Sequence, residues 1–293
     1  MATVPAPPLF YKDIVPLSSA QHADWKVATQ TTAPFLVGQH AVPVTVDEFV
    51  AASRFYPIVF ASGEFPVPLA LMGLNEGVNL FVGDDGALLK QAYVPAYVRR
   101  YPFILLKLSA QAEELSLCFD PTAPGIGPDV DGQPLFEDGQ PSATTREILT
   151  FCEQFEQAGQ RTQAFIDELK KAELLIDGEV AIGVDGIEQP FVYRGFQMVD
   201  EEKLRDLRGD TLRKMSQNGL LPLLYAHLFS MGLMRDLFGE QVQTGKFQLP
   251  PQDGANGAAN AGGAPVAAVL NDGGGGALAA EGANDAAATT PAS

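Results

Sequence analysis

Short apolar runs bounded by turn-forming residues occupy residues 41–120, and longer segments with helical periodicity follow them. Runs of this length are typical of strands, and Gly-Asp-Asp-Gly at 83–86 is typical of a turn. Because strands come first and helices later, the order favours an α+β fold with a largely antiparallel sheet over a parallel nucleotide-binding sheet. The predicted strands are 42–46, 57–61, 67–73, 79–82, 104–109 and 115–120, with a short helix at 47–54.

A long amphipathic helix is predicted next. Thr144 and Glu147 have the spacing of a capping box, and apolar residues then recur at steps of three and four up to Leu169. This pattern predicts one helix, or two helices separated near Gly159. The preceding stretch, 121–142, is unusually long for a loop in a compact domain, so we expect it to be functional or poorly ordered.

Further strands and helices are predicted towards the end of the folded region. The acids at 200–202 favour a helix start, because the positive end of the helix dipole lies there. We expect the helices that follow to pack against the sheet of the N-terminal half. The predicted elements are strands 174–184 and 190–199 around a turn at 185–186, a charged helix ending at 218 and an apolar helix ending at 238.

The composition changes abruptly at Pro250. From there to residue 293 the chain has no aromatic residue, no Lys and no Arg, and small residues dominate. Such a stretch cannot bury enough apolar area to offset the entropy of ordering it. We therefore predict one globular domain at 1–249 and a disordered Ala/Gly-rich tail at 250–293.

The charge balance limits the possible partners. The chain has 36 acidic and 19 basic side chains, a net charge of −17. Because the predicted tail contains few of these acids, the predicted domain is itself acidic. Excess negative charge repels nucleic-acid phosphates and anionic lipid surfaces, so we expect no nucleic-acid partner.

Neither an export signal nor a transmembrane segment is predicted. The first residues contain several prolines and no early positive charge, unlike a secretory signal. The most apolar segment, 220–238, contains Pro222 and Arg235 and is short for a membrane span. The two cysteines, Cys118 and Cys152, suggest no disulfide framework. We expect a soluble, cytoplasmic protein.

Several short motifs resemble one known family. The most specific is Tyr-Val-Pro-Ala-Tyr-Val-Arg-Arg-Tyr-Pro-Phe at 93–103. Others are Pro-Ile-Val-Phe at 57–60, Asn-Leu-Phe-Val at 79–82, Leu-Cys-Phe-Asp at 117–120 and Tyr-Ala-His-Leu at 225–228. In this order, the motifs are similar to those of the SapC family.

The resemblance implies an accessory or binding protein of bacterial surface-layer or nutrient-uptake systems. A peptide transporter permease of the same name is unrelated, and the several membrane spans that a permease needs are not predicted here. The family brings no assigned catalytic residues or cofactor, so the resemblance implies none for this chain.

The block at 93–103 also has the chemistry of a binding site. Tyrosine rings offer stacking faces with a polar tip, and guanidinium groups suit carboxylates, phosphates or sugar hydroxyls. Adjacent arginines cannot share one face of a helix or strand, so we expect one to turn inward to an acid and the other to remain available. The ligand would be a small anion, a carbohydrate or a protein partner, and the alternative is a purely structural role. The candidate residues are Tyr93, Tyr97, Arg99, Arg100 and Tyr101.

An uncharacterised, metal-assisted enzyme is the alternative function. His22 and Asp24, with His40 or His227, have the residue types of a two-histidine, one-carboxylate iron site. However, the stretch around His22 is more typical of a helix cap than of a sheet edge. His227 lies in an apolar segment, where a hydrogen-bonded core histidine is more common. We therefore predict no metal site.

The sequence contains no other recognisable catalytic or ligand-binding motif. The acidic loop at 129–138 lacks an acid that an EF-hand requires, and Cys118 and Cys152 have no adjacent histidine. Neither a Gly-x-Ser-x-Gly elbow nor a Gly-x-x-x-x-Gly-Lys phosphate loop occurs. The sequence therefore predicts no catalytic residues, and it leaves open catalysis by residues that only the fold brings together.

Overall fold

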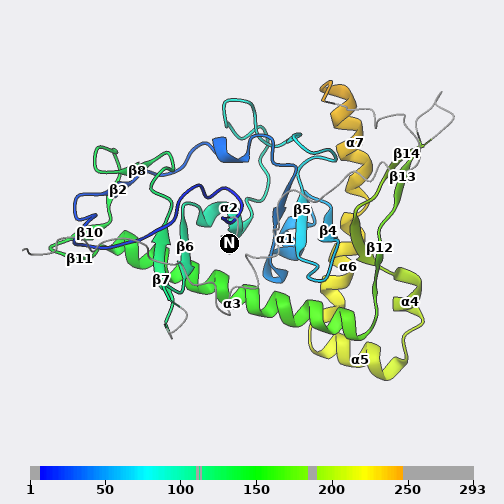
Figure 1. Ribbon diagram of the computed structural model, residues 1–293. Coiled ribbons are helices and arrows are strands. Elements are labelled where there is room, and N and C mark those ends of the chain that lie inside the picture. Colours follow the sequence, from blue (N-terminus) through cyan, green and yellow to red (C-terminus); the bar gives the residue numbers. More distant parts are fainter. Residues whose placement is uncertain (1–6, 110–111, 113, 184–189, 247–293) are drawn as a thin grey trace, which may run out of the picture.

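The structure is a computed structural model that describes residues 7–109, 112, 114–183 and 190–246 (Figure 1). It has two main antiparallel sheets, one long helix that reaches both, and further helices beside the larger sheet. The predicted α+β class with largely antiparallel strands is confirmed. The predicted tail at 250–293 and the predicted turn at 185–186 lie outside the described residues.

The larger sheet has five antiparallel strands and contains the main hydrophobic core. Its central strands have side chains that are buried almost throughout. Strands buried on both faces have continuous apolar sequences, which explains why these strands were predictable. The order across the sheet is β12 (Leu175–Asp177), β15 (Phe196–Val199), β4 (Ile58–Ala61), β5 (Pro68–Leu71) and β3 (Ala41–Pro43).

A second sheet holds its own apolar cluster. It consists of β1 (Val15–Pro16), β7 (Ser116–Phe119) and β6 (Phe103–Leu106). The stretch at 121–142 is built into this region by buried Ile126 and Leu135, so it is not a poorly ordered loop. Short strand pairs also hold it: β2 (Lys26–Val27) with β8 (Ile126–Gly127) and β9 (Gln133–Pro134), and β10 (Phe136–Glu137) with β11 (Gln140–Pro141).

Helix α3 (Ala143–Lys171) connects the two cores without a break at Gly159. Cys152 packs in the smaller cluster, whereas Leu169 packs in the larger one. Figure 1 shows this helix, in green, running along both sheets. The predicted capping box is wrong because Thr144 lies inside the helix. The N-cap is Ser142, whose hydroxyl accepts a hydrogen bond from the following helical turn.

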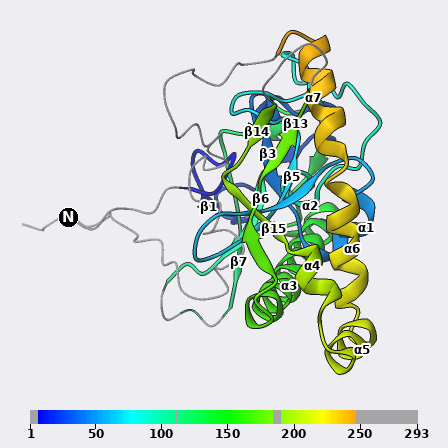
Figure 2. The same cartoon turned by 90° about the vertical axis from the view of Figure 1, so that its right-hand side faces the viewer.

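The C-terminal helices lie beside the larger sheet (Figure 2). The acid that caps the first of them is Asp200, as predicted. The predicted apolar helix to residue 238 is two helices, because the backbone N–H groups of Met231 and Gly232 bond three residues back instead of four. None of the helices in the described part of the chain combines the length and the apolar character that a membrane span requires. The helices are α4 (Glu201–Arg205), α5 (Gly209–Gln217), α6 (Leu220–Ser230) and α7 (Leu233–Gln243).

The predicted strands at 174–184 and 190–199 divide into two pairs. β12 pairs with β15 in the larger sheet, whereas β13 (Val180–Ile182) pairs with β14 (Phe191–Tyr193). Gly178 separates β12 from β13, and a Cβ atom there would lie 2.1 Å from the Phe196 ring. A side chain at this position would therefore clash, which accounts for glycine at the division.

The predicted strand at 79–82 is absent because Asn79 turns the chain. Its Oδ1 accepts hydrogen bonds from the backbone N–H groups of Phe81 and Val82, at 2.8 and 3.1 Å. Its Nδ2 donates to the carbonyls of Leu36 and Gln39. Local side-chain bonds of this kind compete with strand pairing, although the apolar run alone favours a strand.

His227 joins α6 to two central strands. Its ring is fully buried, and Nε2 accepts a hydrogen bond from the Val199 N–H at 3.1 Å. Nδ1 therefore carries the proton and donates to the Ile58 carbonyl at 2.7 Å. Burial lowers the pKa of His227 to about 4, and the bond to Ile58 only partly opposes this effect. The interpretation of His227 as a core histidine is confirmed.

We predict that His227 makes the fold less stable as the pH decreases from 7 to 5. Its folded pKa of about 4 lies below the ordinary value of 6.5, so the unfolded chain binds the proton first. Its stabilising effect is complete above pH 6.5 and declines as the pH falls towards 4. In urea denaturation, the free energy of unfolding of the wild-type protein should fall by about 2 kcal/mol between pH 7 and pH 5. The His227→Gln variant should lack this decrease. The same pH dependence in both proteins would contradict this account.

Candidate functional site

The predicted binding block forms a short helix between the two sheets (Figure 1). Helix α2 (Ala96–Arg100) begins after Pro95. It ends at Arg100, because Tyr101 precedes Pro102 and a residue before proline is disfavoured in the helical region. Tyr93 lies before the helix and Tyr101 at its end, so the three tyrosines do not line one helical face.

Tyr97 and Tyr101 mainly hold the fold together. Tyr97 is fully buried, and its hydroxyl donates to the Leu9 carbonyl at 3.0 Å. The Tyr101 ring is 4.4 Å from the Phe35 ring, centroid to centroid. Burial raises the pKa of both tyrosines to about 12, and the Asp120 carboxylate contributes at Tyr101. Both phenols therefore stay protonated.

Arg100 turns inward to an acid, as predicted for one of the two arginines. Its side chain is 1% exposed, and Nη1 pairs with Oε1 of Glu156 at 3.3 Å. The guanidinium carbon lies 4.2 Å from the Phe155 ring centroid and 4.9 Å from that of Tyr97. Nε and Nη2 have no hydrogen-bond partner among the described residues, so the aromatic faces are the groups that replace their hydration.

Arg99 points outward. Its Nε donates to the Val94 carbonyl at 3.1 Å, and Nη2 donates to the Tyr93 hydroxyl at 3.2 Å. Its guanidinium carbon also lies 5.0 Å from the Phe151 ring centroid. In the described part of the chain, no acid lies within ion-pair distance of Arg99. The guanidinium group is therefore oriented but not neutralised.

Glu48 fixes this arrangement from below the surface. It ends the short helix η2 (Val46–Glu48), just before α1 (Phe49–Ala52), and is 4% exposed. Its Oε2 accepts from the N–H and hydroxyl of Thr45, at 2.9 and 2.8 Å. Its Oε1 accepts from the Ala96 N–H at 2.6 Å and from the Tyr93 hydroxyl at 3.1 Å. Hydrogen bonds thus connect Arg99 through Tyr93 to a buried carboxylate.

Glu48 was not predicted as a site residue, although the sequence contains a capping-box signal for it. Thr45 and Glu48 have the spacing of a capping box, and their side chains and backbone make both of its bonds.

Burial and, to a smaller extent, the negative charge of Glu48 raise the pKa of the Tyr93 hydroxyl. The hydroxyl therefore keeps the proton that it donates to Glu48.

A cavity of about 370 Å³ lies beside Arg99. Its polar lining includes Gln30, Thr31 and Thr32, which precede the short helix η1 (Pro34–Leu36). Its apolar lining includes Tyr101 and Ile148. These residues come from three distant parts of the chain, so no local motif could have brought them together.

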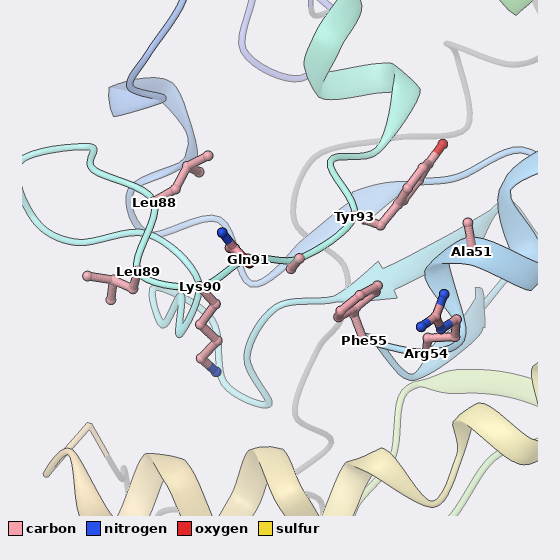
Figure 3. Close-up of a pocket in the computed structure, with 9 residues that line it drawn as sticks. Ala51, Arg54, Phe55, Leu88, Leu89, Lys90, Gln91 and Tyr93 are labelled. Carbon is pink, nitrogen blue, oxygen red and sulfur yellow. The ribbon is translucent and has the colours of Figure 1, made fainter.

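A larger cavity of about 690 Å³ has Tyr93 in its wall (Figure 3). The segment at 88–93 forms one side, with Arg54 and Phe55 opposite. Leu88 also lines the cavity beside Arg99, so the same segment of the chain lies next to both cavities. Tyr93 was predicted from the sequence, whereas the residues that face it were not.

The predicted alternative metal site is not formed. No group of three potential metal ligands occurs among the described residues. Both ring nitrogens of His227 are engaged by backbone groups, so neither is available to a metal. His22 is buried in the other apolar region and its Nδ1 accepts from the Ser18 N–H, whereas Asp24 is exposed. His40 is partly buried, which lowers its pKa.

The two cysteines are buried and unpaired with each other. Burial raises the pKa of Cys118 to about 11 and that of Cys152 to about 12. Both sulfurs therefore remain thiols at neutral pH, whereas a cysteine nucleophile needs the thiolate.

Comparison with known proteins gives one relationship. A model of the SapC family matches residues 17–237, which include both arginines, Glu48 and the linings of both cavities. Searches found no similar curated protein and no similar solved structure.

We predict that Glu48→Gln strongly destabilises the fold. The carboxylate accepts hydrogen bonds from four donors. The amide nitrogen of glutamine is itself a donor, so it would face at least one of these four donors without forming a bond. The free energy of unfolding should fall by about 2–3 kcal/mol in denaturant titrations. Glu147→Gln, at an exposed position on α3, is the matched control and should change it by less than about 0.5 kcal/mol. Equal small effects of both substitutions would contradict the role given to Glu48.

Proposed function

We propose that this chain, which belongs to the SapC family, is a binding or accessory protein of bacterial surface-layer or nutrient-uptake systems. The family match over residues 17–237 establishes membership. The proposed role combines what the family resemblance implies with the chemistry of the Arg99 cavity.

The observation that carries the proposal is the oriented guanidinium of Arg99. The chain has 36 acidic side chains, yet no acid pairs with Arg99 in the described region. Its two hydrogen bonds, to Val94 and Tyr93, limit its motion without neutralising its charge. A fixed positive group beside a cavity supports the binding of an anion.

The lining of the cavity supports a small carboxylate that also carries hydroxyl groups. Its volume of about 370 Å³ is in the range of small-molecule sites. Thr31, Thr32 and Gln30 offer hydroxyl and amide groups, and Tyr101 offers part of an aromatic ring. A sugar acid combines the carboxylate that suits Arg99 with the hydroxyls that suit these polar residues.

We place the protein in a reducing compartment and propose the cytoplasm. Two buried cysteines that form no disulfide support this location. The proposed ligand and the compartment are consistent with a step in the handling of sugar acids before or after their passage through the cell envelope.

The two arginines should respond differently to substitution. Arg99→Gln should leave the melting temperature nearly unchanged, because an exposed charge contributes about 1 kcal/mol or less. It should weaken D-glucuronate binding at least about tenfold in NMR titrations, with D-glucose as the neutral control. Arg100→Gln should lower the free energy of unfolding by about 2–3 kcal/mol and leave the affinity of the folded protein unchanged.

A third variant, Arg213→Gln on α5, removes the same charge at an exposed position away from the cavity. It should retain both stability and binding. The proposal is wrong if glucuronate does not bind the wild-type protein. It is equally wrong if Arg99→Gln binds as well as Arg213→Gln.

A further inference from the structure

The larger cavity has one charged end and one apolar end. Figure 3 shows Arg54 and Phe55 at one end, and Leu88, Leu89 and Lys90 at the other. The volume of about 690 Å³ is sufficient for a ligand larger than a monosaccharide. The function proposed above uses the other cavity, which shares Leu88 with this one, and the remaining lining here has a different chemistry.

Arg54 supplies the charge at the first end. It follows α1, is exposed, and lies with its guanidinium carbon 5.7 Å from the Phe55 ring centroid. Among the described residues no acid lies within ion-pair distance of Arg54. An uncompensated guanidinium in an acidic protein is suited to an anionic group of a ligand.

Lys90 does not supply a second free charge. Its ammonium pairs with the Glu240 carboxylate on α7, and it lies 4.3 Å from the Phe81 ring centroid. This ion pair attaches the segment at 88–93 to α7. The second end of the cavity is therefore electrostatically compensated, although it contains a lysine.

The remaining lining is apolar. Leu88 and Leu89 are 50% and 57% exposed, and Ala51, Phe55 and Ala92 extend the apolar surface towards Arg54. Exposed leucines are common singly, but two neighbouring leucines in the wall of a cavity give a ligand apolar area to cover. Each square ångström of apolar area removed from water contributes favourably to binding.

We propose that this cavity binds an amphipathic monocarboxylate, a single carboxylate joined to an apolar chain or ring. The carboxylate pairs with Arg54, and the apolar part lies along Phe55 and Ala92 towards Leu88 and Leu89. The separation of the free charge from the exposed leucines sets this orientation. A phosphate or a free sugar lacks the apolar part, and a neutral lipid lacks the charge.

Displacement of the fluorescent anion 1-anilinonaphthalene-8-sulfonate by octanoate and by 1-octanol tests the proposal. Octanoate should displace the dye from the wild-type protein at least about tenfold more effectively than octanol, because it alone gains a charge-assisted bond. Arg54→Gln should lower the affinity for octanoate about tenfold and leave the affinity for octanol unchanged. Arg213→Gln, the matched control, should leave both affinities unchanged.

Leu89→Glu tests the apolar end of the cavity. The variant should fold, because an exposed position tolerates a charge. It should lower the affinity of the protein for octanoate and for octanol together. Equal displacement by octanoate and octanol would overturn the proposal, as would an Arg54→Gln variant with wild-type affinity for octanoate. Loss of octanoate binding in Arg99→Gln with none in Arg54→Gln would also overturn it, because the ligand would then occupy the other cavity.

Discussion

A buried carboxylate whose oxygens are satisfied by hydrogen bonds alone determines the arrangement of the site. Glu48 accepts four hydrogen bonds and belongs to no ion pair within the described residues. A carboxylate withdrawn from water costs several kcal/mol unless donors replace its hydration. The donors come from Thr45 on one side and from Tyr93 and Ala96 on the other. Because all four must be in place together, the carboxylate holds the chain before α2 against the start of α1.

The directions of the two arginines follow from this attachment. With the start of α2 fixed at Ala96, consecutive residues near its end must point to different sides. Arg100 therefore enters the space between the sheets, where Glu156 and two aromatic rings receive it. Arg99 remains at the surface, and its bond to Tyr93 connects it to the same carboxylate. One buried group thus separates a structural arginine from one that stays at the surface.

Local patterns predicted much of this molecule, and long-range contacts account for the remainder. Apolar runs located β4, β5, β6 and β7, and periodicity located α3, because burial dictates both patterns. The run at 79–82 was misread because a single side chain, that of Asn79, makes competing bonds. The sequence block at 93–103 predicted one inward and one outward arginine, but it could not identify which. That choice depends on Glu48, which lies far from the block in sequence, and the facing cavity residues are equally distant.

The coupling energy between Glu48 and Tyr93 shows whether the carboxylate holds the chain before α2. It is measured by a double-mutant cycle in which Glu48→Ala, Tyr93→Phe and the double variant are compared with the wild-type protein in denaturant titrations. If the carboxylate holds the chain before α2 through this hydroxyl, the two substitutions are non-additive, with a coupling energy of about 1 kcal/mol or more. Additive effects, within about 0.3 kcal/mol, would show that Glu48 does not hold Tyr93 and would contradict the account.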